Sequence, residues 1–293
     1  MRGRAFDVLQ VPSPVTAAVP HLAEIAAHAA RLGSTVLSYW VERDAVRIWA
    51  VDGEARVRQA VVRTDARRLA QLVRATWSRD DARARAVTTR GGARALPGNA
   101  TRALRELHEL LITPIAHALP RTGARRLTIV PHGTLFRLSF AGLRSSSGRY
   151  LLEDFEIHYT PSLGVLGATE ATARHAATSG ALVVAAPVLG KALSSEGLEP
   201  LPGAAAEGTA VAALAAPPAA AVLIGPRATE SEVRRLAGGR RVLHFASHAV
   251  VSDDHPLDSF LALASGAAGG DADGRFTAEE VYELRLDADL VVL

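Results

Sequence analysis

The first part of the chain alternates between helical and strand-like hydrophobic patterns. Residues 12–33 read as a leader helix that ends near Gly33, and residues 34–64 alternate between apolar and polar positions. Turn signals at Arg43-Asp44 and Asp52-Gly53 divide the alternating stretch, which predicts a three-stranded antiparallel meander. Two amphipathic helices follow, at residues 65–77 and 99–119. The expected buried stripes are Leu69, Leu72, Val73 and Trp77 in the first helix, and Leu104, Leu107, Leu111, Ile115 and Leu119 in the second.

The second part has continuous apolar runs separated by helical segments. The predicted strands are "RLTIV", "EIHY", "ALVVA", "AVLIG", "RVLHFAS", "SFLALA" and "DLVVL", and the predicted helices include "AAAEGTAVAAL", "ESEVRRLA" and "TAEEVYEL". Strands that alternate with helices predict an α/β fold with a mostly parallel sheet flanked by helices. Sites in such sheets form beyond the carboxyl ends of the strands. His248 and the point beyond Leu293 are therefore expected at the same edge of the sheet.

The positive charge is concentrated in one segment. The 293-residue chain has a net charge of +3, and residues 56–94 hold eleven arginines against Asp65, Asp80 and Asp81. Such a block could bind phosphates or an acidic partner, but a solvated arginine-rich helix face is the commoner reason for it. No aromatic residues are interleaved as base stacking would need, so the sequence gives little support to nucleic-acid binding.

Composition also bounds the class of protein. There is no cysteine, which excludes a disulfide scaffold and a thiolate zinc site within these residues. The N-terminus has no signal-peptide core, and Pro217-Pro218 interrupt the longest apolar run, so neither secretion nor a membrane span is predicted. We expect a cytoplasmic protein.

Few sequence motifs indicate a catalytic, metal-binding or cofactor-binding site. His244 and His248 lie on a strand pattern without an intervening glutamate, which argues against a metal site. "GGDADGRFTAEE" matches part of a calcium-binding loop, but Gly269 replaces its first carboxylate, and we favour a helix capped by Thr277 and Glu280. No phosphate-binding glycine loop or GxSxG elbow follows a strand, so no cofactor is predicted. From the residues alone, His248 is more often structural than catalytic.

Six blocks in order resemble the CHAT domain, a caspase-like domain of bacterial proteins often joined to tetratricopeptide repeats. They are "RLTIVPHGTLFRLSFAGL", "YLLEDFEIHYTPSLGVL", "LEPLPGAAAEGTAVAAL", "VLIGPRATESEVRRL", "VLHFASHAVVSDDHPLDSFLAL" and "DGRFTAEEVYELRLDADLVVL". The resemblance implies a caspase-like cysteine peptidase that cleaves protein partners, with His248 as the catalytic histidine and the backbone N–H of Ala249 in the oxyanion hole. It also implies three parts: a leader helix at 1–33, a pseudo-caspase half at 34–175 and a catalytic half at 176–293.

The sequence departs from the family at three points. Ala249 replaces the usual glycine, and His132 stands where the family has aspartate in "PDG". In the family the strand resembling "ADLVVL" continues into S-A-C, whereas this sequence ends at Leu293. We therefore expect a truncation just before the nucleophile, and the 293-residue chain itself should be inactive as a cysteine peptidase. The alternative is a non-catalytic protein-interaction module with the same fold.

Overall fold

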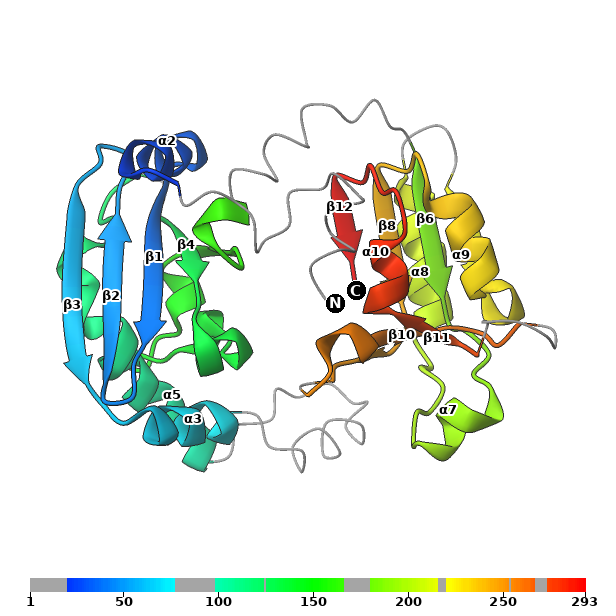
Figure 1. Cartoon of the computed structure of the whole chain (residues 1–293), viewed down its shortest axis with the longest axis horizontal. Coiled ribbons are helices and arrows are strands. Elements are labelled where there is room, and N and C mark those ends of the chain that lie inside the picture. The colour runs from blue at the N-terminus through cyan, green and yellow to red at the C-terminus, as the bar shows by residue number, and fades with distance from the viewer. Residues whose placement is uncertain are drawn as a thin grey trace, which may run out of the picture. The chain divides into compact units, whose positions relative to one another are not determined.

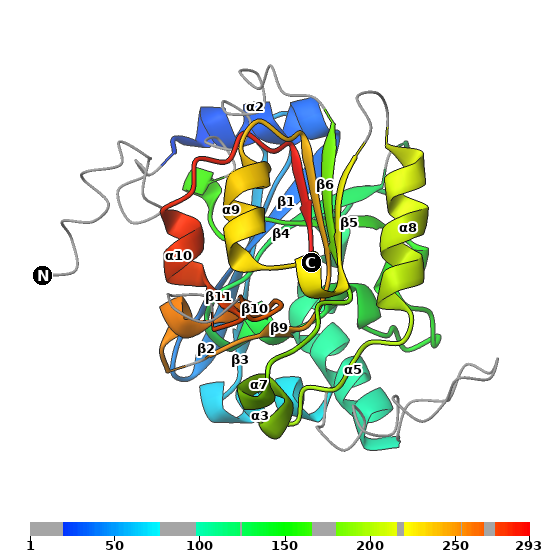
Figure 2. The same cartoon turned by 90° about the vertical axis from the view of Figure 1, so that its right-hand side faces the viewer.

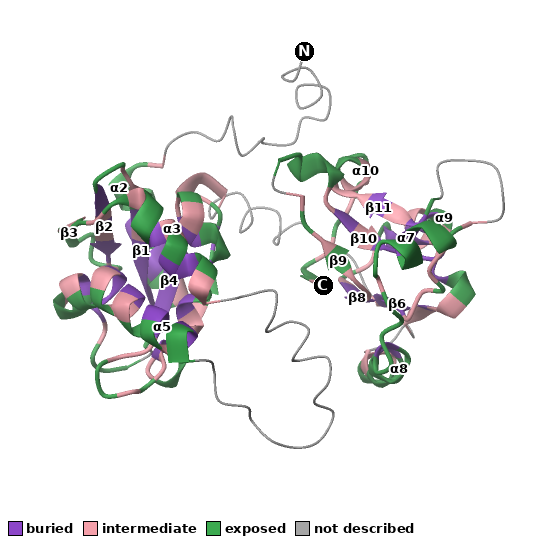
Figure 3. Cartoon of the chain, turned by 90° about the horizontal axis from the view of Figure 1, so that it is seen from below, coloured by how far each residue is buried: buried purple, intermediate pink, exposed green. Residues whose placement is uncertain are grey.

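The computed structural model describes residues 20–76, 98–123, 125–165, 180–215, 220–252, 254–266 and 273–293. The chain forms two compact units, Met1–Glu170 (unit 1) and Ala171–Leu293 (unit 2), coloured blue to green and green to red in Figure 1. In each unit the central strands of the main sheet are largely buried, whereas its outer strands include exposed residues (Figure 3).

Unit 1 is built on a mixed five-stranded sheet with the order β3-β2-β1-β4-β5. Strands β1 to β3 form the expected antiparallel meander, and β1, β4 and β5 are parallel to one another. Its strands are β1 (Ser34–Val41), β2 (Ala45–Val51), β3 (Val57–Arg63), β4 (Arg126–Val130) and β5 (Glu156–Tyr159). Its helices are α2 (Leu22–Leu32), α3 (Ala66–Ala75) and α5 (Gly98–Leu111), with short 3₁₀ turns η1 (Thr113–Ala118), η2 (Gly133–Arg137), η3 (Phe140–Gly142) and η4 (Leu151–Glu153).

The helices of unit 1 follow from their caps and apolar stripes. The Asp65 carboxylate accepts the N–H groups of Arg67 and Arg68 and so starts α3. The expected stripe residues of both helices are buried, except Trp77, which lies outside the described residues. The second predicted helix is interrupted: α5 ends at Leu111 and the chain continues as η1, because Pro114 has no N–H to extend the α-helical ladder.

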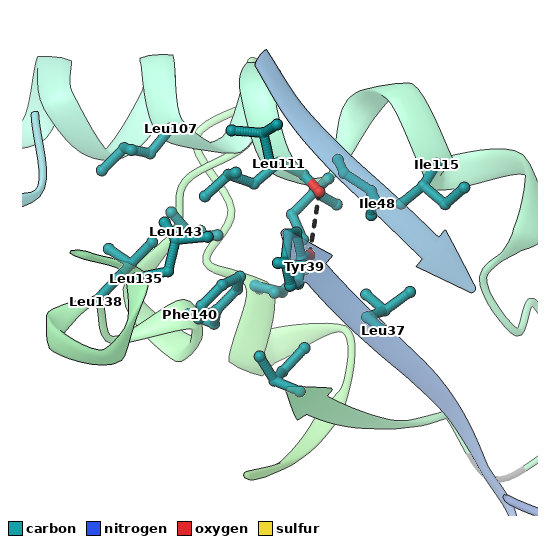
Figure 4. Close-up of a cluster of buried hydrophobic side chains, with 14 of the residues drawn as sticks. Leu37, Tyr39, Ile48, Leu107, Leu111, Ile115, Leu135, Leu138, Phe140 and Leu143 are labelled. Atoms are coloured by element: carbon teal, nitrogen blue, oxygen red, sulfur yellow. Dashed lines mark hydrogen bonds between the residues drawn. The ribbon is translucent and has the colours of Figure 1, made fainter. Parts of the chain in front are cut away.

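The core of unit 1 lies between the sheet and α3, α5 and η1 (Figure 4). Within this core, the Tyr39 hydroxyl donates a 3.1 Å hydrogen bond to the Leu111 carbonyl. That carbonyl belongs to the last turn of α5 and has no helical partner of its own. Burial raises the pKa of Tyr39, so the phenol stays a donor and completes the helix end from within the core.

Unit 2 contains a four-stranded sheet with the order β12-β8-β6-β7, and every neighbouring pair is parallel. The strands are β6 (Ala181–Ala185), β7 (Ala221–Ile224), β8 (Val242–Ala246) and β12 (Leu290–Val292). The helical elements are α7 (Lys191–Ser195), α8 (Ala204–Leu214), η5 (Gly225–Arg227), α9 (Glu230–Ala237), η6 (Pro256–Asp258) and α10 (Ala278–Tyr282). Helix α8 covers one face of the sheet, and α9 and α10 lie on the other (Figure 2).

A second, smaller sheet in unit 2 differs from the sequence-based prediction of the strand arrangement. The "SFLALA" strand does not join the parallel sheet; it forms β10 (Phe260–Ala262) between β9 (Ala249–Val250) and β11 (Arg275–Thr277), antiparallel to both. A short continuous apolar run fits a strand in either kind of sheet, so the pattern did not identify the partner.

The helix cap expected at Thr277 is present. The Thr277 hydroxyl accepts the Glu280 N–H at 3.2 Å, and the Glu280 carboxylate accepts the Thr277 N–H at 2.7 Å. This capping box starts α10. Gly269, the first position of the calcium-like pattern, lies outside the described residues. Among the described helices, none combines the length and apolar character required to cross a bilayer.

Candidate active site

Strand β8 points alternate side chains to the two helical layers of unit 2. Leu243 and Phe245 join the core that contains Val233 of α9, whereas His244 faces α8. The buried His244 Nε2 lies 3.0 Å from a carboxylate oxygen of Glu207 on α8. This hydrogen bond satisfies a polar ring inside the sheet–helix interface, which is a structural role.

His248 lies two residues beyond β8, at the carboxyl edge of the sheet. Its Nε2 is 2.6 Å from the backbone carbonyl oxygen of Glu199. A carbonyl can only accept, so Nε2 must carry a proton. In the neutral imidazole the lone pair is then on Nδ1, which has no hydrogen-bond partner among the described residues. The contact with Glu199 therefore orients the ring and leaves Nδ1 able to accept a proton.

The backbone around His248 is held by β10. The Ala262 N–H donates to the His248 carbonyl at 2.8 Å, and the Ser247 hydroxyl donates to the Ala262 carbonyl. The first bond makes the Ala249–Leu261 pair a non-hydrogen-bonded pair of the antiparallel ladder. The Ala249 N–H consequently points away from β10 and is left available to another acceptor.

A small cavity of about 50 Å³ adjoins the histidine. It is lined by Ala186, Pro187, Leu189, Glu199, Pro200, Leu201, Ser247 and His248. Ala186 has a φ of 45°, a left-handed conformation that is rare for a residue with a side chain. Its N–H donates to the Ala246 carbonyl at 3.1 Å, which ties the ends of β6 and β8 together beneath the cavity.

Strand β12 runs parallel to β8 along its free edge. Leu290 is level with Val242, and Val292 is level with His244. As expected, β12 and β8 are parallel neighbours, so both run toward the edge of the sheet at which His248 lies. In the same register, the third position after Leu293 would be level with His248.

Unit 1 contains a second histidine in an equivalent place. His132 follows the parallel strand β4, and its Nδ1 accepts the Val41 N–H at 3.1 Å. The Trp40 ring stacks on it with a centroid separation of 4.1 Å. The Nδ1 lone pair and one face of this imidazole are both occupied, so His132 has a structural role after β4.

Sequence reasoning identified His248, Ala249 and β12 but not Glu199 or Ala262. Both of these residues act through backbone atoms, so their side chains give no signal. Within the described residues, no three histidine, aspartate or glutamate side chains are grouped as metal ligands.

Comparison with known proteins gives one family. A family model described as "CHAT domain" matches residues 101–293, about two thirds of the chain. No curated protein matches the chain.

Proposed function

Because the chain belongs to the CHAT domain family, we propose that it supplies the histidine half of a caspase-like cysteine peptidase, with His248 as general base and the Ala249 N–H as an oxyanion donor. The observation that carries this proposal is the hydrogen bond from His248 Nε2 to the Glu199 carbonyl. This bond supports the neutral tautomer whose lone pair is on Nδ1, an atom without a described hydrogen-bond partner.

The nucleophile of this proposal is a cysteine at the third position after Leu293. Two independent arguments give the same position. The family's strand continues into S-A-C, and a continuation of the β12–β8 register beyond Val292 and His244 would make the third position level with His248. Neighbouring strands lie about 4.8 Å apart, which brings a thiol on one within reach of an imidazole on the other.

The chemistry then follows from the geometry. Nδ1 of His248 takes the thiol proton, and the thiolate attacks the carbonyl carbon of the peptide bond. The negative charge that develops on the carbonyl oxygen is stabilised by the Ala249 N–H, which β10 does not use. The imidazolium then protonates the leaving amine, and the Glu199 carbonyl stabilises its positive charge.

We propose that the two units divide this work as a pseudo-caspase half and a catalytic half in a cytoplasmic bacterial protein. In unit 1, the equivalent His132 is used to hold the β1–β2 turn region through Val41. The substrate is a protein partner, in line with the family's peptidase chemistry.

The experiment is to read the codons that follow Leu293 and to express the resulting natural product. An electrophilic peptide probe should label it at the new cysteine, and His248→Ala should abolish labelling. A His244→Ala variant is a poor control because it opens the α8 interface, so His132→Ala is the matched control. A natural product with no cysteine near the third position would contradict the proposal.

That contradictory result would support the second candidate, a non-catalytic interaction module. The absence of cysteine from all 293 residues favours it. The module would bind its protein partner equally well with histidine or alanine at position 248.

A further inference from the structure

Unit 1 contains a cavity of about 320 Å³ that the proposed peptidase chemistry does not use. It lies between one face of the meander and the end of η1. Its lining combines strand residues with the chain that leaves η1: Thr35, Ala50, Asp52, Arg56, Arg58, His117, Ala118, Leu119 and Pro120. Its volume is at the lower end of the range for small-molecule sites.

The Thr35 side chain forms part of the wall and is unusual for a buried polar group. Thr35 is 5% exposed, and its hydroxyl makes no hydrogen bond with any described residue. It alternates with Val36 along β1, so it shares a face with Leu37, which packs in the unit 1 core. A buried hydroxyl without a partner costs free energy, so a ligand oxygen at this point would recover the missing bond.

Two arginines line the same cavity. Arg56 is paired with Asp52 at 2.7 Å and with Glu54 at 2.9 Å. Arg58 contacts only the carbonyl of its neighbour Val57, at 3.2 Å, and no described carboxylate. Asp52 and Glu54 share the single guanidinium of Arg56, whereas the Arg58 guanidinium has no described carboxylate partner and can donate to an anionic ligand in the cavity.

We propose that this cavity binds a small phosphate ester. The Arg58 guanidinium and the Thr35 hydroxyl donate to the phosphate oxygens, and the His117 ring adds a third donor. The organic part packs against Ala50, Ala118, Leu119 and Pro120. Arg56 and Arg58, at the start of the arginine-rich segment, thus belong to a specific binding site, whereas the composition of the segment suggests a solvated surface.

The test is calorimetric titration of the 293-residue chain with glycerol 3-phosphate in low-salt buffer without other phosphate. Saturable binding is expected. Arg58→Gln should weaken it about tenfold or more, because a charge-assisted hydrogen bond is lost. Thr35→Val should weaken it by a smaller factor while leaving the ligand-free protein at least as stable as wild type, because the hydroxyl has no partner to lose.

The matched control is Arg67→Gln, which removes the same charge from the same arginine-rich segment on the exposed side of α3. It should bind glycerol 3-phosphate like wild type. Equal weakening by Arg67→Gln and Arg58→Gln would show a diffuse charge effect and overturn the site. So would an absence of saturable binding, and acetate binding as tightly as glycerol 3-phosphate would overturn the assignment to phosphate.

Discussion

The two strand-end histidines show how one position in a sheet can be used in opposite ways. His132 in unit 1 and His248 in unit 2 each follow a parallel strand at its carboxyl end. In unit 1, Trp40 and the Val41 N–H occupy the ring face and Nδ1. In unit 2, the only described partner is the Glu199 carbonyl at Nε2, and Nδ1 is left available. The difference lies in the neighbouring strand: β1 extends past His132, whereas β6 turns away beside His248 at Ala186.

The largest expected effect is on catalysis. In a product that carries the proposed cysteine, His248→Ala should reduce the rate of peptide cleavage about 10²–10⁴-fold, as loss of a general acid–base does. His132→Ala should leave the rate close to wild type. Steady-state cleavage of a fluorogenic peptide measures both rates. Comparable losses in the two variants would show that the two histidines do not have different roles in cleavage.

The next effect is on the packing of unit 2. A Cβ added to Gly208 of α8 would lie 2.5 Å from the Ala185 Cβ of β6, so Gly208→Ala should destabilise this unit by about 1–3 kcal/mol. All three tryptophans belong to unit 1, so their fluorescence reports that unit, while circular dichroism reports both. In urea, the dichroism transition should shift and the fluorescence transition should stay.

The control for this packing effect is Gly203→Ala. Gly203 precedes the same helix, and a Cβ there meets nothing within 4 Å. A similar loss of stability in both variants would mean that the close α8–β6 contact is not the cause.

A smaller effect is expected on the stability of unit 1. His132→Ala removes the acceptor of the Val41 N–H and the stacking partner of Trp40, at a cost of about 1–2 kcal/mol. The fluorescence transition should move to lower urea, with a change in the native emission of Trp40. His248→Ala should leave that transition in place; a shift there would show that the stability of unit 1 does not depend on His132 alone of the two histidines.

The smallest effect is a difference in pH response. Burial lowers the pKa of His108 in α5, so its contribution to stability is present above pH 6.5 and is lost as the pH falls. Burial raises the pKa of Glu230 in α9, so its contribution is present at low pH and is lost as the pH rises. Acidification should therefore lower the free energy of unfolding of unit 1 through His108 and raise that of unit 2 through Glu230.

Urea transitions of His108→Gln and Glu230→Gln, compared at pH 7 and pH 5, isolate the two groups. Each variant should show a flatter pH dependence than wild type, in the fluorescence signal for His108 and in the dichroism signal for Glu230. A variant that keeps the full wild-type pH dependence would assign the effect to other groups.

Periodicity and local chemistry made most elements predictable. The stripe from Leu104 to Leu119 and the cap formed by Thr277 and Glu280 depend on residues close in sequence, and both are present as expected. Pro114 ends the α-helical hydrogen bonding, although the apolar stripe continues past it to Leu119. The partner of β10 was not predictable, because strand pairing depends on long-range contacts that a single short apolar run does not encode.

The candidate site was predictable only in part. His248 and His132 occupy similar sequence contexts, and the resemblance to the family separated them where composition could not. What distinguishes them physically is a carbonyl from Glu199, far away in sequence, and a tryptophan from the adjacent strand. Backbone acceptors carry no side-chain signature, so this part of the site needed the structure.

The parallel pairing of β12 with β8 also has a consequence for biosynthesis. Short turns join the three strands of the unit 1 meander, and the last strand ends at Arg63. The meander can therefore form early, while the ribosome is still making the rest of the chain. β12 reaches its place beside β8 only after α10 has been made, and the strand edge beside His248 stays open until then. A nascent chain could thus fold the meander of unit 1 well before the β8 edge of the parallel sheet in unit 2 is covered by β12.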